Sequence, residues 1–592
     1  MGNALDPIAA TLLEKLQTAQ SVVQIYRSAF PISNSFSVGF DNAVDWLRKN
    51  RPLVKLEVLT DPIMADAVVF FRADANIWAG PLLPPMPDPW ISVAISAADF
   101  DEFFADQRTK NQHPDTSRPF NATPVQPDGT TLINDFSRLN ETAVREVVGY
   151  KQARWPWAAF APAEADLCNV VAQAARNGHK VSIAGKRHSQ GGHTFYPDAV
   201  VLDMTDYNQI LGLDPVAKTI RVQSGTSWDL IQRFIQPHGL SVAVMQAYPY
   251  FTVGGSLSVG VHESDLRFGP IIDTVNSFRL LLADGRVLDV SRTCNHDLFG
   301  LVIGGYGLFG LILDVELQLT DDMLLEQTVV TTHAADFAKQ LRACMTDDSI
   351  IYGYARPCFV DDGRFMDEMS MVTCKRIPVG AQGAAPFEIQ EMTYLGLRKL
   401  IYDLSRRYVW GKEIKWQLQT AYGDNFGINA ISRNNLMRAD IRIPGDYRSS
   451  SDTDALQEYF VSVDNFAQFA KDAGAILRQN DVNVMSVGVR YVPRSTASTL
   501  SYSAASDVLG VIMVINHARS PQGIEAVARW TRAIIDLALS LGGTYYLPYA
   551  AYATKDQARR AYPRLSEFIA KKNQYDPNHT FCNWFFENYC SS

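Results

Sequence analysis

Residues 181–204, VSIAGKRHSQGGHTFYPDAVVLDM, place a polar loop between two apolar runs. Both runs are short and rich in Val, Ile, Leu and Ala, which predicts two buried strands. Between them stand Gly185, Gly191 and Gly192. Because glycine tolerates positive φ, such a loop can turn several backbone amides toward one anion. The pattern therefore predicts a loop that binds a diphosphate.

The segments around this loop alternate between helical and strand patterns. Residues 164–178 carry apolar side chains on one helical face, and Gly178 supplies a stop. Residues 219–225 read as a strand, and the next helix has Ser227 as its N-cap and Gly239 beyond its end. An Asp-Gly pair in residues 281–291 predicts a hairpin. The region is therefore expected to be an α+β fold.

A second glycine-rich segment lies at residues 251–264, FTVGGSLSVGVHES. It adds the hydroxyls of Ser256 and Ser258, and we expect the two segments to clasp one extended cofactor. GYGLFG at 305–310 matches the G-x-G-x-x-G pattern, but the residues after it alternate with period two. A dinucleotide fingerprint must open a helix, so the sequence argues against a nicotinamide-binding Rossmann unit there.

Size and charge narrow the class of protein further. A chain of 592 residues exceeds the size of a single core, so two or three domains are expected. The net charge of -9, without a basic stripe, argues against a nucleic-acid partner. The N-terminus lacks the basic region of a signal peptide, and the apolar run at 298–313 is too short to span a bilayer. We expect a cytoplasmic protein without a membrane span.

The cysteines and histidines favour no metal centre. None of the seven cysteines forms a C-x-x-C pair, which favours reduced thiols over a zinc site or a disulfide framework. HESDL at 262–266 begins like H-E-x-x-H, but Leu266 stands where the second ligand is required. No metal site is expected.

Five motifs follow one another in an order that resembles a known family: AGKRHSQGGH, TVGGSLSVGVHESDLRFGP, LLADGRVLDVS, GGYGLFGLILDVELQL and KKNQYDPNHTFCNWFF. They resemble FAD-dependent oxidoreductases of the vanillyl-alcohol oxidase and p-cresol methylhydroxylase family, nearest the branch of alditol and aldonolactone oxidases and cytokinin dehydrogenases. The resemblance covers roughly residues 130–330 and 540–590. It implies an α+β fold, in which a two-subdomain FAD-binding domain is interrupted by a substrate domain with an antiparallel sheet and flanking helices.

This resemblance divides the chain into four parts. The expected parts are an N-terminal extension of unknown role (1–130), the FAD-binding domain (131–330), the substrate domain (331–540) and a C-terminal segment that returns to the FAD domain (541–592). Helices are expected near residues 8–22 and 97–107 of the extension. We expect the extension to pack on the catalytic body and to shape its entrance or an oligomer contact. A homo-oligomer is therefore possible.

The resemblance also implies which residues bind FAD. The expected set is Ile183, Ala184, Gly185, Lys186, Arg187, His188, Ser189, Gln190, Gly191, Gly192, His193, Gly254, Gly255, Ser256, Ser258, Gly260, His262, Ile312 and Asn583. Glu263 departs from the family pattern, which usually has glycine there. Asn583 could instead cap the chain end.

His188 takes the place of the histidine that commonly bears the flavin through its 8α-methyl group. We therefore expect FAD to be bound covalently through His188, with His193 as the second candidate for this bond. The alternative is that His188 forms a hydrogen bond to the cofactor and no covalent bond. Some relatives carry a second tether, from a cysteine just before TVGG. Tyr248, Pro249 and Tyr250 stand there instead, so we expect one tether at most.

The catalytic residues are predicted less directly. VNVMSVGVRYVP resembles the family strand that faces the flavin, and it retains Arg490. In polyol oxidases a glutamate precedes this arginine by two residues and a lysine lies in the C-terminal loop; here Gly488 and Tyr549 take those places. We therefore do not carry over polyol chemistry. Arg490 could stabilise a developing negative charge or only form a salt bridge.

A cluster of phenols, Tyr545, Tyr546, Tyr549 and Tyr552, lies near the expected flavin face. Tyr546 and Tyr549 are the candidates to accept a substrate proton or to hold an apolar substrate, with plain packing as the alternative.

The expected function is that of an FAD-linked oxidase or dehydrogenase. It would move hydride to FAD from an alcohol-like C–H donor of small or medium size, and oxygen or another acceptor would reoxidise the cofactor. One alternative is a flavin-dependent reductase or electron-transfer protein that uses a partner protein or acts on an alkene. Another is a silent binding protein or a hydrolase, although the sequence has no G-x-S-x-G elbow.

Overall fold

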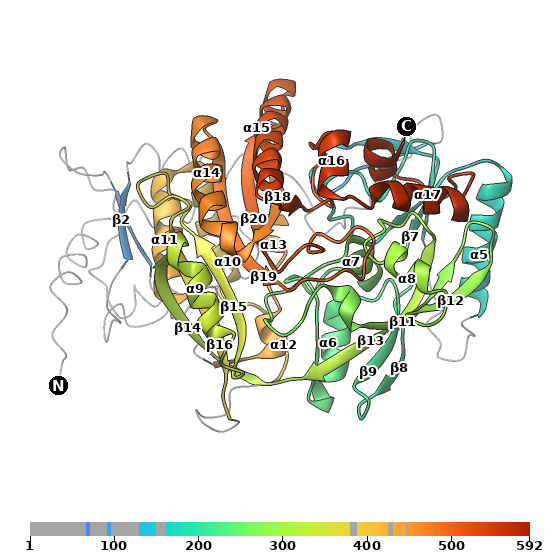
Figure 1. Cartoon of the computed structure of the whole chain (residues 1–592), viewed down its shortest axis with the longest axis horizontal. Helices are drawn as coiled ribbons and strands as arrows, with labels where there is room; N and C mark the ends of the chain where they lie inside the picture. Colours follow the sequence, from blue (N-terminus) through green and yellow to red (C-terminus); the bar gives the residue numbers. More distant parts are fainter. Residues whose placement is uncertain are drawn as a thin grey trace, which may run out of the picture.

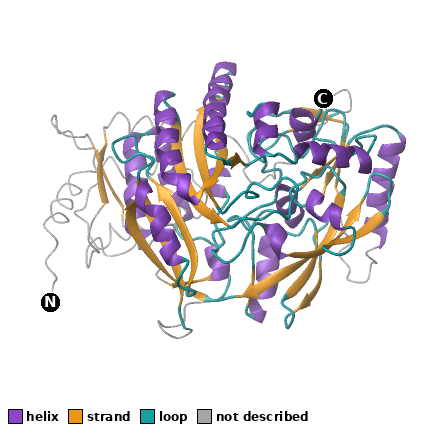
Figure 2. Cartoon of the chain, in the orientation of Figure 1, coloured by secondary structure: helices purple, strands orange, loops and turns teal. Residues whose placement is uncertain are grey.

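The computed structural model describes residues 67–71, 91–95, 130–149, 161–378, 387–423, 430–445 and 447–591. Its two large parts are a set of small sheets with helices, at the right of Figure 1, and an eight-stranded sheet with helices on both faces, at the left. Loops drawn in teal in Figure 2 gather between the two parts. The site described below lies among these loops.

A parallel sheet holds the loop of residues 185–199. Its strand order is β5 (Glu146–Gly149), β7 (Val200–Asp203), β6 (Val181–Ala184), and helix α5 (Ala161–Arg176) leads into β6. The hairpin of β3 (Thr131–Ile133) and β4 (Thr142–Val144) precedes it. The C-terminal segment adds to the open edge of this sheet, because the amide of Val181 donates to Thr580 O and that of Cys582 donates to Val181 O. The expected strands on both sides of the loop are therefore confirmed.

A six-stranded antiparallel sheet lies beside the parallel one. Its order is β12 (Val287–Ser291), β11 (Val275–Leu281), β13 (Leu311–Asp321), β9 (Thr219–Gln223) and β8 (Ile210–Asp214), and β10 (Leu240–Val242) pairs with β13. Helices α6 (Trp228–Ile235), α7 (Val253–Val259) and α8 (His296–Val302) connect these strands. Ser227 caps α6, because its hydroxyl accepts the amide of Leu230 at 3.3 Å, and Gly285 turns the hairpin at φ 86°.

The third large sheet is antiparallel, with the order β17-β14-β16-β15-β19-β20-β18-β21. The strands are β14 (Leu324–His333), β15 (Ile350–Pro357), β16 (Glu368–Arg376), β17 (Ala430–Ser432), β18 (Asp452–Ser462), β19 (Asn483–Val492), β20 (Val508–Ala518) and β21 (Thr544–Tyr545). The sheet takes in β14 from Leu324 onward, so it begins before the expected domain boundary at 330. It also takes in β21, from the start of the C-terminal segment.

Successive side chains of β18 point to opposite faces of this sheet, and helices cover both faces. Tyr459 packs on Phe469 of α14 (Phe466–Gln479), with ring centroids 5.9 Å apart, whereas its neighbour Glu458 lines the cavity described below. Helices α9 (Ala334–Cys344) and α15 (Pro521–Ser540) share the side of α14. Helices α10 (Leu395–Arg407), α11 (Val409–Tyr422), α12 (Arg433–Leu436) and α13 (Arg442–Gly445) lie on the cavity side.

The two ends of the chain contribute smaller elements. Strands β1 (Ala67–Phe71) and β2 (Ile91–Ile95) form an antiparallel hairpin, and β2 lies against α11 (Figure 1). The helices expected near residues 8–22 and 97–107 lie outside the described residues. Helices α16 (Lys555–Ala561), α17 (Leu565–Tyr575) and η4 (Phe586–Cys590) end the chain.

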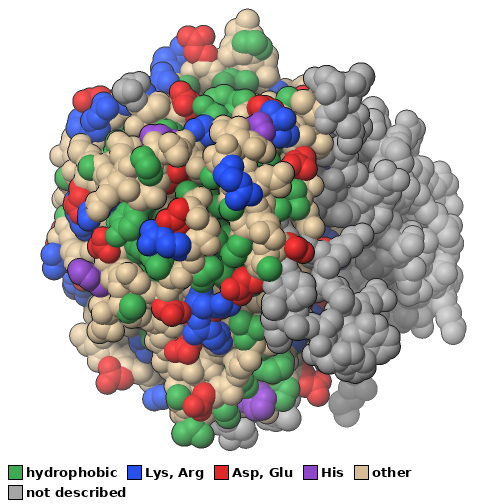
Figure 3. Space-filling view, turned by 90° about the vertical axis from the view of Figure 1, so that its right-hand side faces the viewer, with side chains coloured by type: hydrophobic (Ala, Val, Ile, Leu, Met, Phe, Trp, Pro, Cys, Tyr) green, Lys and Arg blue, Asp and Glu red, His purple; other side chains and the backbone are tan. Residues whose placement is uncertain are grey.

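The surface of the part with the small sheets, at the right of Figure 1, is mixed in charge. On the face shown in Figure 3, Lys and Arg side chains are interspersed with Asp and Glu. Among the described residues no helix is long and apolar enough to cross a membrane.

Candidate functional site

A cavity of about 520 Å³ lies where the two parts of the molecule meet. Its walls come from residues 183–190, 251–264 and 306–312 on one side and from β15, β18, β19 and β20 on the other. This volume is within the usual range of small-molecule sites, about 300–1,000 Å³. The cavity therefore joins the loop expected to hold a cofactor to the strands expected to meet a substrate.

The loop of residues 185–193 is fixed by the hairpin before it. The carboxylate of Asp135 accepts the amide of Gly192 at 2.9 Å, and the side chain of Asn140 donates to Gln190 O at 2.9 Å. Asp135 is fully buried, and burial raises its pKa. Arg187 adopts φ 57° and Gly192 φ 69°, which is the left-handed backbone that turns successive amides to one side.

The two glycine-rich segments are in direct contact, as expected from the sequence. A methyl group on Gly185 would lie inside contact distance of Thr252 Oγ1, and one on Gly254 would lie 2.8 Å from Ser224 Cβ. Thr252 is the N-cap of α7, into which the second segment folds. The absence of a side chain at Gly185 therefore permits the close approach of the two segments, and that at Gly254 permits the approach of the second segment to Ser224, just after β9.

Two histidines of the loop line the cavity in their neutral form. Burial, together with the charge of Lys186, lowers the pKa of His188 to about 3. Its ring lies 4.7 Å from that of Phe251 and 5.1 Å from that of Phe136. Burial lowers the pKa of His193 to about 4, and its Nε2 lies 3.0 Å from Leu547 O. Both imidazoles therefore carry a lone pair at neutral pH.

Most of the residues expected to bind FAD line this cavity. They are Ile183, Ala184, Gly185, Lys186, Arg187, His188, Ser189, Gln190, His193, Gly254, Gly255, Ser256, Ser258, His262 and Ile312. Gly191, Gly192, Gly260 and Asn583 lie behind the wall instead. The side chain of Asn583 donates to His193 O and to Tyr306 O, each at 2.8 Å, so it fixes the backbone of two wall segments.

Several buried polar atoms of the wall have no hydrogen-bond partner within the described part of the chain. They are Ser189 Oγ, Gln190 Nε2, His193 Nδ1, Thr194 Oγ1, Ser224 Oγ, His262 Nδ1 and Glu263 Oε2. Buried polar groups in native proteins are almost always paired. A polar cofactor in the cavity would supply partners along this wall, and the chemistry of FAD, with its diphosphate, ribityl hydroxyls and ring carbonyls, fits the set.

The opposite wall is the cavity face of the eight-stranded sheet. Arg490 lies on β19 and lines the cavity, as expected. At the position of the family glutamate, Gly488 leaves space that the neighbouring strand fills: a methyl group there would lie 2.7 Å from Arg356 Nη1. Arg356 also lines the cavity and was not predicted.

The four tyrosines of residues 545–552 separate into two pairs. Tyr546 and Tyr549 line the cavity, whereas Tyr545 and Tyr552 do not. The hydroxyl of Tyr546 donates to Val259 O at 2.9 Å, so a backbone carbonyl already engages it. Burial and the nearby Glu458 carboxylate, which is within hydrogen-bonding reach, raise the pKa of Tyr549 well above its usual value. Tyr549 is therefore the phenol better placed for proton transfer.

Glu458 is the main functional candidate that the sequence did not reveal. It lies on β18, is 2% exposed, and its Oε1 lies 3.0 Å from Nε2 of His262. The only signal in the sequence is a lone acidic residue in the run LQEYFV. That signal is weak, because a strand at a sheet surface has the same composition.

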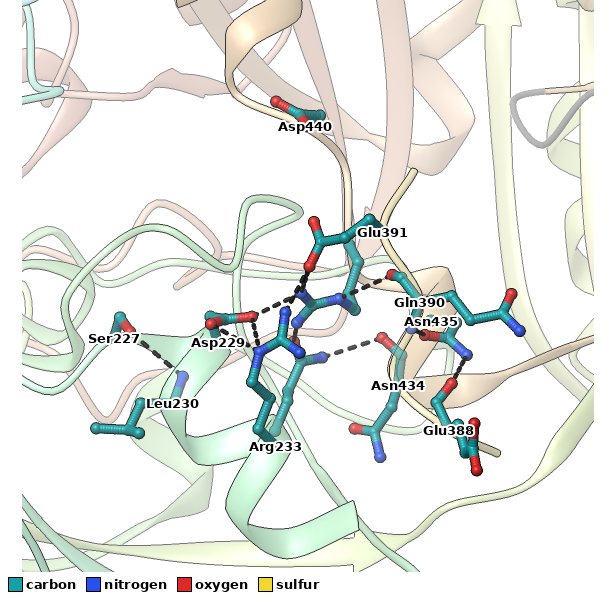
Figure 4. A network of polar contacts seen from close by, with 12 residues as sticks. Ser227, Asp229, Leu230, Arg233, Glu388, Gln390, Glu391, Asn434, Asn435 and Asp440 are labelled. Carbon is teal, nitrogen blue, oxygen red and sulfur yellow. Dashed lines mark hydrogen bonds and ion pairs between the residues drawn. The ribbon is translucent and has the colours of Figure 1, made fainter. Parts of the chain in front are cut away.

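Ion pairs hold the two parts together at the edge of the cavity. Arg438 lines the cavity and donates to Asp229 at 2.6 Å and to Gln232 at 2.9 Å, both on α6. Arg233, one turn after Asp229, pairs with Glu391 at 2.5 Å. Figure 4 shows Asp229 and Arg233 of α6 facing Glu391 and Gln390. The network fixes the position of the segment before α10 relative to α6.

Comparison with known proteins supports the resemblance. Residues 158–291 match the model of the FAD binding domain. L-gulonolactone oxidase of Mus musculus is 30% identical over 163 residues, which are 28% of this chain and 37% of that enzyme. Mitochondrial L-galactono-1,4-lactone dehydrogenase of Brassica oleracea is 25% identical over 256 residues (43% of this chain, 40% of the enzyme), and cytokinin dehydrogenase 4 of Arabidopsis thaliana is 31% identical over 148 residues (24% and 28%).

Each of these alignments spans well under half of the relative. The matched residues contain both glycine-rich segments that line the cavity. These similarities support the family and branch expected from the motifs: residues 158–291 match an FAD binding domain, and the relatives include a gulonolactone oxidase, a galactonolactone dehydrogenase and a cytokinin dehydrogenase.

Proposed function

We propose that this chain is an FAD-dependent oxidase or dehydrogenase that oxidises an alcohol-like carbon of a small or medium organic substrate. One observation carries the proposal: a single cavity joins the glycine-rich FAD segments to the strand of Arg490. The parallel and six-stranded sheets then correspond to the two FAD subdomains, and the eight-stranded sheet belongs to the substrate domain.

In this proposal residues 185–192 hold the diphosphate and residues 254–262 lie along the flavin. His188 bears the cofactor covalently. Its low pKa supports this role, because only a neutral imidazole can act as the nucleophile that forms the bond. Lys186 assists by keeping His188 neutral through its positive charge.

Bound FAD supplies the two-electron acceptor, and the side chains of the chain bind and orient the substrate. The side chain of Arg490 lines the cavity and has an electrostatic contact with Tyr549, so its guanidinium can stabilise negative charge that develops in the cavity. Tyr546 acts mainly in packing, since its hydroxyl is bonded to Val259 O.

The names of the relatives suggest lactones and cytokinins as the first substrate classes to test. A cytoplasmic location, oxygen as the electron acceptor and a homo-oligomer stay predictions. The proposal is tested with the purified chain, mixed anaerobically with L-gulono-1,4-lactone, L-galactono-1,4-lactone, a cytokinin or glycerol.

We expect a yellow protein whose flavin absorbance bleaches with at least one of these compounds. A protein that stays colourless after incubation with FAD would contradict the proposal. A yellow protein that none of the compounds bleaches, but that a reduced partner protein reduces, would favour the electron-transfer alternative.

A further inference from the structure

A buried carboxylate and a buried imidazole lie together on the cavity wall, where the eight-stranded sheet meets the second glycine-rich segment. Glu458 projects from β18 into the cavity, and His262 meets it from the turn after α7. Both side chains are nearly inaccessible, at 2% and 4% exposure. Burying a carboxylate is costly unless it is hydrogen-bonded, so a pair placed here needs a reason.

The pairing of strands places Glu458 next to the substrate residues. Ile512 of β20 pairs with Glu458 on one side and with Gly488 of β19 on the other. Arg490 lies two residues beyond Gly488 on the same face. Glu458 therefore lies in the same row of the sheet as Gly488, with β20 between their two strands.

Tyr549 connects this carboxylate to the open part of the cavity. It is only half-buried and lines the cavity, within hydrogen-bonding reach of Glu458. On the far side of the carboxylate, His262 Nε2 can donate to Oε1. The carboxylate therefore lies between a phenol that can donate a proton to it and an imidazole that fixes its direction.

We propose that Glu458 is the proton acceptor of the oxidation, and that Tyr549 relays to it the hydroxyl proton of an alcohol substrate. This inference rests on the proposed function. The C–H bond of the carbinol breaks and its electron pair leaves with the hydrogen as hydride, for which FAD is the acceptor. The O–H proton passes to the Tyr549 oxygen as Tyr549 gives its own proton to Glu458. The product is the carbonyl compound, and Glu458 ends as the neutral acid.

His262 is a positioning residue in this scheme. Its contact with Glu458 fixes the Nε2–H tautomer and the direction of the carboxylate, in the way that a buried acid orients a catalytic histidine elsewhere. The other ionisable groups that face the carboxylate or its relay are Tyr248, Tyr502, Tyr546, Tyr562 and Arg490.

The test compares Glu458→Gln and Tyr549→Phe with Tyr552→Phe. Glutamine keeps the shape of Glu458 but cannot take up the proton. Tyr552 is a matched control because it is a buried tyrosine of the same segment that does not line the cavity. Flavin content and thermal unfolding establish that each variant folds and carries the cofactor.

The first measurement needs no substrate. The pH dependence of the midpoint potential of the bound flavin, followed in dithionite titrations, gives the number of protons taken up per electron pair. In the proposed scheme the oxidation ends with the flavin reduced and Glu458 protonated, so reduction of the flavin is coupled to uptake of a proton by Glu458. We expect Glu458→Gln to take up one proton fewer than wild type, and Tyr552→Phe to match wild type. Equal uptake in wild type and Glu458→Gln would overturn the proposal.

The second measurement is the rate of anaerobic flavin bleaching with L-gulono-1,4-lactone or whichever hydroxyl-bearing compound of the set above bleaches the wild type. We expect Glu458→Gln and Tyr549→Phe to be slower by ~10²-fold or more, with the dependence on pH lost in Glu458→Gln. A yellow Glu458→Gln protein that reacts within about 3-fold of wild type, below the range for a lost acid or base, would overturn the role of Glu458 but leave the proposed function intact. A colourless wild-type protein would contradict the proposed function itself.

Discussion

Replacing Gly185 by alanine tests the contact between the two glycine-rich segments. The added methyl group would lie inside contact distance of Thr252 Oγ1 and 3.4 Å from Thr252 Cβ. Overpacking of this kind costs about 1–3 kcal/mol, and loss of the Thr252 cap on α7 adds about 1 kcal/mol. If the cofactor lies between the segments, 1–3 kcal/mol corresponds to roughly 5- to 150-fold weaker FAD binding.

The assay measures FAD affinity by flavin fluorescence in a His188→Ala background, in which the cofactor is expected to exchange. Gly212→Ala is the control, since a methyl group there meets nothing within 4 Å. Thr252→Ala should relieve part of the clash. The double variant Gly185→Ala/Thr252→Ala should therefore lose less FAD affinity than the two single variants together. Unchanged FAD affinity and stability in Gly185→Ala, as in Gly212→Ala, would refute the reasoning.

Three further predictions concern the wall of the cavity. Arg490→Ala should retain the flavin spectrum yet slow anaerobic bleaching by about 10²-fold; an unaltered rate would remove Arg490 from the mechanism. Tyr546→Phe should lower the free energy of unfolding by about 1 kcal/mol, from the lost bond to Val259 O, and leave bleaching unchanged; slow bleaching at normal stability would restore its catalytic role. In urea unfolding of the apoprotein, the free energy of unfolding should fall as the pH drops from about 6.5 toward 4, because His188 and His193 bind protons in the unfolded chain but stay neutral when buried. His193→Gln should reduce this dependence on pH. An unaltered dependence would exclude His193 as a cause.

The sequence predicted best those features that depend on local chemistry. Two apolar runs gave the strands β6 and β7 around the loop, Ser227 gave the helix cap, and Asp284-Gly285 gave the hairpin. The period-two pattern after Gly310 correctly excluded a Rossmann helix, because residues 311–321 form β13. Each of these signals lies within one element, where backbone preference and burial act on neighbours in the sequence.

Long-range pairing could not be predicted in the same way. Glu458 meets His262 across 196 residues of chain, and Arg356 fills the space at Gly488 from another strand. The register of the eight-stranded sheet decides both, and no local signal in one sequence fixes that register. The role of Asn583 could not be predicted for the same reason. Its motif was recognised, but only the fold shows that its side chain donates to two backbone carbonyls from distant segments.

The most direct test of the central claim is the mass and absorbance of the purified chain. We predict a flavin spectrum that stays with the polypeptide after acid precipitation, and an intact mass raised by one FAD. In His188→Ala the mass should return to that of the bare polypeptide, while the folded protein still binds FAD reversibly. A wild-type chain that shows no flavin absorbance, even after incubation with FAD, would contradict the account.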